Sequence, residues 1–132
     1  MKPYATALLP GDGVGPEVTA VARDVLVAVG ERYSRSFTFT SELIGGVAID
    51  ATGESLPEAT LAACRASDAI FLGTVGGPKW DGGSVRPEQG LLGLRKALEL
   101  FANVRPTRVY SDLVDRSPLK REFVEDVDFV MF

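Results

Sequence analysis

An acid, two leucines and a cation recur at helical spacing in the second half of the sequence. A helix places all four on one face, at positions i, i+3, i+4 and i+7: Glu88, Leu91, Leu92 and Arg95. Such a face suits the wall of a pocket for a ligand with a branched apolar tail and a carboxylate. The alternative is that the leucines belong to the core while the charged groups reach solvent at its edge.

A second cation, Arg105, follows shortly after this helical segment. Two guanidinium groups can hold a carboxylate through paired, charge-assisted hydrogen bonds. Because arginines are common on protein surfaces, Arg95 and Arg105 support a carboxylate site only in combination with the leucine-bearing face.

A glycine-rich loop follows the first apolar run, with Gly11, Gly13 and Gly15 leading into a helix that starts with Pro16. Glycines let a backbone approach a phosphate closely, and the free N–H groups of a helix start attract anions. The dinucleotide fingerprint, however, needs its third glycine one residue later, and Pro16 removes one donor. The loop therefore either binds a nucleotide or packs a strand against a helix.

A long segment rich in glycine and proline, Gly73–Pro87, is expected to be a loop, and loops of this length are usually functional or disordered. Within it, Lys79, Trp80 and Asp81 indicate either a mobile lid anchored by Trp80 or a surface loop that a buried tryptophan holds in place.

The remaining composition excludes several classes of site. The sequence has no histidine and one cysteine, Cys64, so an intrachain disulfide, a zinc site and a histidine-activated nucleophile are all excluded. Cys64 is expected to pack as a small apolar residue. Asp126 and Asp128 suggest a metal pair, but their position favours a turn that enters a strand.

Charge and hydropathy indicate a cytoplasmic protein. The net charge is −4, so we expect no nucleic-acid partner and no anionic membrane partner. No apolar run approaches the roughly 20 residues that cross a bilayer. The residues Met1–Tyr4 enter a strand-like run directly, without a signal peptide.

Apolar periodicity predicts an α/β fold with a largely parallel sheet. The expected strands are Tyr4–Leu9, Ser36–Ile44, Ala69–Leu72 (buried on both faces) and Val127–Phe132, with extended segments around Val104 and Val109. The expected helices start at Gly15, at Val47 (to Ala51), at Pro57 (to about Ala66), at Gln89 (to Leu100) and at Ser117. The first helix should bury Val18, Val21, Ala22, Val25, Leu26 and Val29, and the Gln89 helix should bury Leu94, Leu98 and Phe101. Because the sequence stops within the apolar strand, we expect an incomplete domain.

Several ordered blocks together resemble the β-decarboxylating dehydrogenases, and within them the 3-isopropylmalate dehydrogenases. The blocks are Leu9–Val18, Gly45–Asp50, Leu72–Asp81, Arg86–Leu92, Leu94–Lys96, Leu100–Pro106 and Ser117–Lys120. The resemblance implies an isocitrate/isopropylmalate dehydrogenase-like two-domain fold of which only the N-terminal portion is present. Residues 1–98 would be the first half of a discontinuous first domain on the cofactor side, and residues 99–132 the start of a second domain.

The same resemblance implies an NAD-dependent oxidoreductase of leucine biosynthesis that converts 3-isopropylmalate to 2-oxoisocaproate, with Mg²⁺ or Mn²⁺ as metal. It implies substrate contacts for Arg95, Arg105, Glu88, Leu91 and Leu92. It implies cofactor contacts for Gly77, Pro78, Lys79, Trp80, Glu88, Asn103 and Val14. The catalytic groups, the metal ligands and a third substrate arginine would lie beyond Phe132, so the chain alone is expected to be inactive. A homodimer is implied for the whole enzyme.

Leucines at positions 91 and 92 favour isopropylmalate over isocitrate, because they cannot hydrogen-bond an extra carboxylate whose desolvation costs several kcal/mol. Tartrate or another alkylmalate stays open as the substrate. Two other classes also stay open: a non-catalytic nucleotide-binding module, and a regulatory subunit of a heteromeric dehydrogenase.

Overall fold

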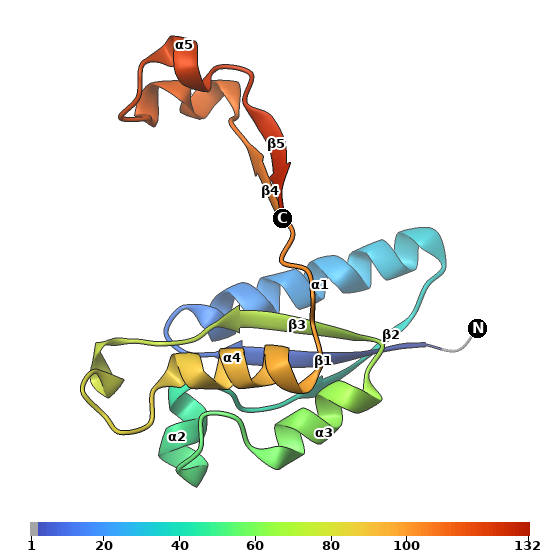
Figure 1. The fold of residues 1–132 in the computed structure, drawn as a ribbon. Coiled ribbons are helices and arrows are strands. Elements are labelled where there is room, and N and C mark those ends of the chain that lie inside the picture. The colour runs from blue at the N-terminus through green and yellow to red at the C-terminus, as the bar shows by residue number, and fades with distance from the viewer. Residues whose placement is uncertain (1–2) are drawn as a thin grey trace. The chain divides into compact units, whose positions relative to one another are not determined.

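The first strand, β1 (Tyr4–Gly11), is the middle of a three-stranded parallel sheet in the computed structural model, which describes residues 3–132. It pairs with β2 (Phe37–Ser41) on one side and with β3 (Ala69–Thr74) on the other, in the order β2-β1-β3 (Figure 1). The α/β prediction is confirmed. The chain divides into two compact units, Met1–Glu99 and Leu100–Phe132.

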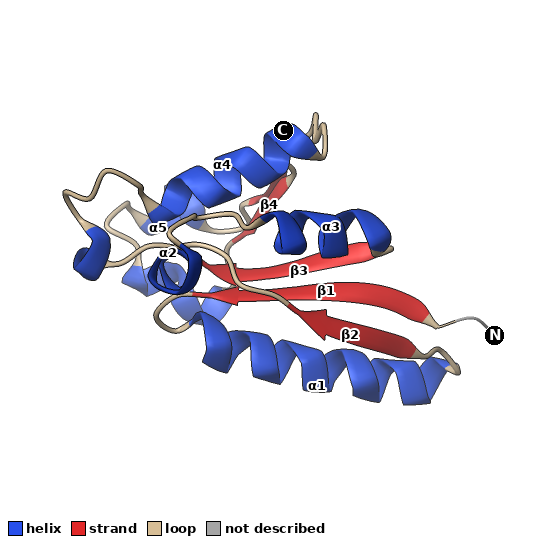
Figure 2. Cartoon of the chain, turned by 90° about the horizontal axis from the view of Figure 1, so that it is seen from below, coloured by secondary structure: helices blue, strands red, loops and turns tan. Residues whose placement is uncertain are grey.

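Helix α1 (Gly15–Tyr33) covers one face of this sheet, and Figure 2 shows α3 and α4 on the opposite face. The predicted apolar face of α1 is wrong for its four valines: Val18, Val21, Val25 and Val29 are between 43% and 62% exposed. The helix instead buries small residues, namely Gly15, Thr19 and Gly30, with Ala22 and Leu26 half-buried. Small side chains let the helix axis approach the sheet more closely than valines would, so the valines turn to solvent.

The core lies on the opposite face of the sheet, beneath α2 (Gly46–Thr52), α3 (Glu58–Ala66) and α4 (Pro87–Ala97). Its buried members are Ala7, Leu9, Ile44, Leu61, Cys64 and Leu94. Cys64 packs as an apolar residue, as predicted, and burial, followed by the nearby Glu42 carboxylate, raises the pKa of its thiol.

Three expectations about apolar segments are corrected. The strand β3 is half-buried rather than buried on both faces, because it pairs only with β1 among the described residues and forms an edge. The strand β2 ends at Ser41, short of the expected Ile44. Leu94 is buried and Leu98 packs against the core, but Phe101 is fully exposed, because α4 ends at Ala97.

The second unit is built on an antiparallel pair, β4 (Arg105–Arg108) and β5 (Asp128–Met131). Between them lie a 3₁₀ helix, η2 (Ser111–Arg116), and the short helix α5 (Arg121–Val124). The helix expected at Ser117 starts later because the Ser117 hydroxyl accepts a hydrogen bond from the Leu119 N–H at 3.1 Å and stabilises a turn. Buried hydrophobic side chains in this unit are Val114 and Val124.

Candidate functional site

The carboxyl ends of β1 and β3 lie side by side, and the connections that leave them run to opposite faces of the sheet. The chain that leaves β1 runs through α1 on one face, whereas the chain that leaves β3 runs through η1 (Pro78–Trp80) to α4 on the other (Figure 2). Such a switch point is where open α/β sheets bind ligands. The loops at this point begin after Gly11 and after Thr74.

Asp12 links three chain segments at this edge. Its side chain is 1% exposed. Oδ2 accepts hydrogen bonds from the N–H groups of Gly46 and Gly76, and Oδ1 accepts one from Val47, each at 2.8 Å. Its backbone N–H donates to the Thr74 carbonyl at 2.7 Å, and the Thr74 hydroxyl donates to the Asp12 carbonyl at 2.6 Å. Sequence reasoning missed this residue; the available signal was the glycine pair in each of the two segments that approach it.

The glycine loop packs tightly against its neighbours. Gly11 has a φ of 70°, and a Cβ there would collide with the Thr74 carbonyl. A Cβ on Gly15, the first residue of α1, would collide with the Pro10 carbonyl. Close packing accounts for Gly11 and Gly15 without a nucleotide, whereas a Cβ on Gly13 would meet no atom within 4 Å, so the geometry leaves both roles of the loop open.

The candidate substrate face lies on the exposed side of α4. The helix starts with Pro87 and buries Pro87, Gly90 and Leu94. Glu88, Leu92 and Arg95 are exposed and Leu91 is half-buried. Leu92 is 62% exposed, so it is not a core residue in this chain. An apolar side chain flanked by an acid and a cation is therefore available to a ligand.

The loop after β3 runs directly past this face. Gly76 has a φ of 106°, and a Cβ on it would lie 2.8 Å from Glu88 Oε1. Glu88 also lies 4.0 Å from the Arg86 guanidinium, in an exposed ion pair that contributes little to stability. The candidate cofactor loop and the candidate substrate face are thus neighbours at Gly76 and Glu88.

The segment Lys79–Trp80 is fastened to α2. Within the 3₁₀ helix η1 (Pro78–Trp80), the Lys79 ammonium donates to Asp50 Oδ2 at 2.6 Å, and Trp80 Nε1 donates to Asp50 Oδ1 at 3.2 Å. The bond from Lys79, then that from Trp80, lowers the pKa of the Asp50 carboxyl. The Trp80 indole packs on Gly46, where a Cβ would collide with the ring. These contacts support a loop held in place by its tryptophan, although Trp80 is only half-buried.

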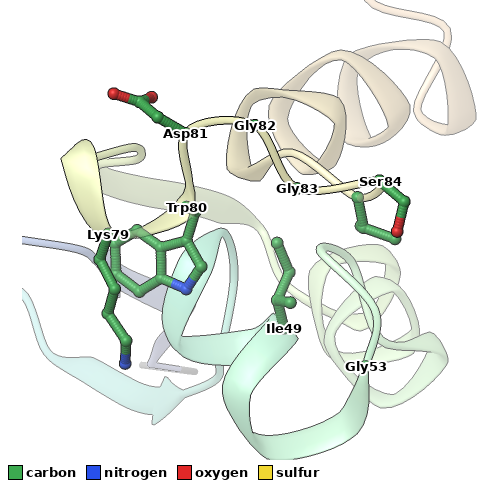
Figure 3. Close-up of a pocket in the computed structure, with 9 residues that line it drawn as sticks. Ile49, Gly53, Lys79, Trp80, Asp81, Gly82, Gly83 and Ser84 are labelled. Carbon is green, nitrogen blue, oxygen red and sulfur yellow. The ribbon is translucent and has the colours of Figure 1, made fainter.

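A hollow of about 440 Å³ lies between α2 and this loop. Figure 3 shows the side chains of Ile49 and Trp80 on adjoining sides of it, while the Asp81 carboxylate points away. Gly82, Gly83 and Ser84 form the opposite wall.

The remaining predicted site residues lie at the start of α1 and in the second unit. Val14, just before α1, is 54% exposed. Asn103 lies beside Arg105; with its amide oxygen toward the guanidinium, it accepts from both Nε and Nη2 at 3.2 Å. Because Arg95 and Arg105 belong to different units, a shared carboxylate between them stays a prediction.

Within residues 3–132 no group of three or more acidic or cysteine side chains could hold a metal ion. Asp126 has a left-handed backbone (φ 64°) and Asp128 lies 3.9 Å from Arg108, an arrangement that fits the turn we favoured. Over the same residues, no helix combines the length and apolar character needed to span a membrane.

Residues 5–132 match the family model described as isocitrate/isopropylmalate dehydrogenase. The chain belongs to this family. Among similar proteins, the 3-isopropylmalate dehydrogenase of Bacillus licheniformis is 59% identical over 127 residues, which cover 95% of this chain and 34% of that protein. Those of Bacillus subtilis and Synechococcus elongatus are 58% and 57% identical, with 95% and 98% of this chain covered.

Solved structures of the family share the fold. The isocitrate dehydrogenase of Methylococcus capsulatus superposes with a TM-score of 0.74 at 32% identity, over 96% of this chain and 33% of that one. A β-decarboxylating dehydrogenase of Thermococcus kodakarensis gives 0.66 at 36% identity, over 80% of this chain and 30% of that one. The chain spans about a third of the length of the curated relatives it matches.

Proposed function

We propose that the chain is the N-terminal part of an enzyme that oxidises 3-isopropylmalate with NAD and releases carbon dioxide, giving 2-oxoisocaproate for leucine biosynthesis. The observation that carries the proposal is the exposed face of α4, where Leu92 lies between Glu88 and Arg95. Relatives that carry the name 3-isopropylmalate dehydrogenase, at 57–59% identity, support the same substrate.

The α4 face supplies the chemistry that this substrate needs. Leu91 and Leu92 offer dispersion and burial to an isopropyl group, and Arg95 offers a planar donor fork to a carboxylate. Arg105 is assigned to the same substrate, and the Asn103 amide beside its guanidinium restricts the orientation of that group. An isocitrate carboxylate placed on the two leucines would lose its hydration without a donor to replace it.

We assign the cofactor to Val14, Gly77, Pro78, Lys79, Trp80 and Glu88 at the switch-point edge of the first unit. Asn103, in the second unit, is assigned to the cofactor by the resemblance to the family alone. The edge fits a dinucleotide in two respects. The Cα of Gly76 lies beside the Glu88 carboxylate, so the loop after β3 and the α4 residue assigned to the cofactor are neighbours. A Cβ on Gly13 would meet no atom within 4 Å, so the loop before α1 has space beside it. When bound, NAD accepts a hydride from the substrate.

A divalent metal, Mg²⁺ or Mn²⁺, is part of the proposal. The described residues gather no ligand set. Its ligands and the catalytic acid–base groups are assigned to sequence outside this chain, so residues 1–132 by themselves are expected to be inactive. The whole enzyme is proposed to be a cytoplasmic homodimer.

The domain assignment also stays a proposal: residues 1–98 form part of the first domain and residues 99–132 begin the second. Support comes from the division of the chain between Glu99 and Leu100, one residue from the proposed boundary.

A chimera tests the function of this chain. Residues 1–132 are joined to the part of the Bacillus subtilis relative that follows the matched segment, with the intact relative as the positive control. The chimera should form NADH from 3-isopropylmalate in the presence of Mg²⁺ or Mn²⁺. A chimera that melts like the control yet forms no NADH contradicts the proposal.

A further inference from the structure

The Asp12 carboxylate is buried without a cation partner. Its side chain is 1% exposed, and none of the ion pairs formed within the described residues includes it. Backbone N–H groups of Gly46, Val47 and Gly76 donate to it instead. A buried carboxylate is tolerated only with such compensation, so its position depends on all three donors.

Two of these donors belong to the first turn of α2. The residue before the helix, Gly45, has no side chain that could cap it, so the free N–H groups of Gly46 and Val47 find their acceptor in Asp12. A negative charge at this end of a helix is favoured by the helix dipole. Asp12 therefore fixes the start of α2 against the end of β1.

The third donor, Gly76, directly precedes Gly77–Trp80, the segment assigned to the cofactor. Its N–H is held by Asp12, and its Cα lies beside Glu88 of α4. The far end of the segment, Lys79–Trp80, is held by Asp50 of α2. The first turn of α2 is itself held by Asp12. The Asp12 carboxylate therefore fixes one end of Gly76–Trp80 directly, and it fixes the other end through α2.

We propose that Asp12 is a positioning residue for NAD: it holds the segment Gly76–Trp80 in the conformation that receives the dinucleotide. The proposal rests on the proposed function. Asp12 touches neither substrate nor reacting atoms in this account and acts through the loop alone.

The test uses Asp12→Asn in the chimera. Asparagine keeps the size but offers one acceptor oxygen for the three N–H groups, and its NH₂ group faces at least one of those donors. The matched control is Thr60→Val. Thr60 is also 1% exposed in the same unit, and its hydroxyl donates to the Leu43 carbonyl at 2.7 Å, a bond that includes no residue of Gly76–Trp80.

Three quantities are measured on both variants: the Kd for NADH, the exchange rate of the loop and the KM for 3-isopropylmalate. Fluorescence titration with NADH gives its Kd, and hydrogen–deuterium exchange follows the peptide Val75–Trp80. In Asp12→Asn we expect the Kd for NADH to rise about tenfold or more and the peptide to exchange about tenfold faster. The KM for 3-isopropylmalate at saturating NAD should stay within about twofold. Thr60→Val should alter none of these values.

The outcomes separate the inference from the proposed function. A wild-type chimera that binds NADH but forms none from 3-isopropylmalate contradicts the function, and the loss of NADH affinity in Asp12→Asn still upholds the inference. A wild-type chimera that does not bind NADH overturns the inference. An Asp12→Asn variant with a lower melting temperature but unchanged NADH affinity and exchange also overturns the inference. An equal loss of NADH affinity in Thr60→Val overturns it as well.

Discussion

Two leucines on α4 test whether this helix presents a ligand face apart from the core. Substitution by alanine should lower catalysis at Leu92 and stability at Leu94. Leu92 is 62% exposed and Leu94 is 4% exposed. Leu92→Ala in the chimera removes the Cγ and both Cδ carbons from the proposed isopropyl wall. Full burial of those carbons is worth about 2.4 kcal/mol, at about 0.8 kcal/mol for each carbon.

A wall contacts its ligand from one side, so about half of that value, about 1.2 kcal/mol, is lost in the transition state. The kcat/KM for 3-isopropylmalate should therefore fall about eightfold, while the free energy of unfolding changes by less than about 0.5 kcal/mol. Leu94→Ala should instead lower the free energy of unfolding by about 2–5 kcal/mol, because it opens a cavity in the core.

The assay combines initial rates of NADH formation with urea unfolding of both variants. If Leu92→Ala loses stability like Leu94→Ala and keeps its kcat/KM, Leu92 is a packing residue in the whole protein, and α4 presents no substrate wall.

Three further predictions concern the ion sites and the chain itself. Arg95→Lys in the chimera should lower kcat/KM by about tenfold or more without a change in melting temperature, because lysine loses the planar fork; unchanged kinetics would make Arg95 an ordinary surface charge. Because the pKa of Asp50 is lowered in the folded chain, its hydrogen bonds to Lys79 and Trp80 stabilise the loop fully at any pH above the ordinary carboxyl pKa. This stabilisation is lost as the pH falls through the lower pKa of the folded state. The difference in tryptophan fluorescence between the chimera and its Asp50→Asn variant should therefore vanish in acid. A difference independent of pH would show that the Asp50 carboxylate does not hold Lys79 and Trp80. Expressed alone, residues 1–132 should show no dehydrogenase activity and no cooperative melt by circular dichroism. The α1 valines and the edge of β3 are exposed in the first unit, and the 33 residues of the second unit bury few apolar side chains. A sharp, reversible melt of a monomer would show a self-sufficient domain.

The sequence predicted those helices and strands in which the pattern of apolar residues agrees with local signals such as a proline at the start of a helix. The buried run after Tyr4 became β1, Pro57 preceded α3, and Pro87 opened α4 with its mixed face toward solvent. For α1 the pattern misled, because it contains two competing stripes. Valines form the more hydrophobic one, but Gly15 and Gly30 lie on the other, and close approach to the sheet decided the orientation.

The role of Asp12 could not be predicted from local patterns. Its three donors lie more than 30 residues away along the chain, and each belongs to a glycine pair or the residue after it. Only the order β2-β1-β3 brings those segments to the same edge. The edge position of β3 could not be predicted for a similar reason, since an apolar run does not reveal whether a second neighbouring strand is present.

The most direct test of the central claim, that the leucine face of α4 selects an alkyl-substituted malate, is the ratio of kcat/KM for 3-isopropylmalate to that for isocitrate. Both are measured in the chimera with saturating NAD and Mg²⁺. We expect a ratio of at least about a hundredfold in favour of 3-isopropylmalate, because isocitrate would bury an unpaired carboxylate against Leu91 and Leu92. Equal or faster turnover of isocitrate would contradict it.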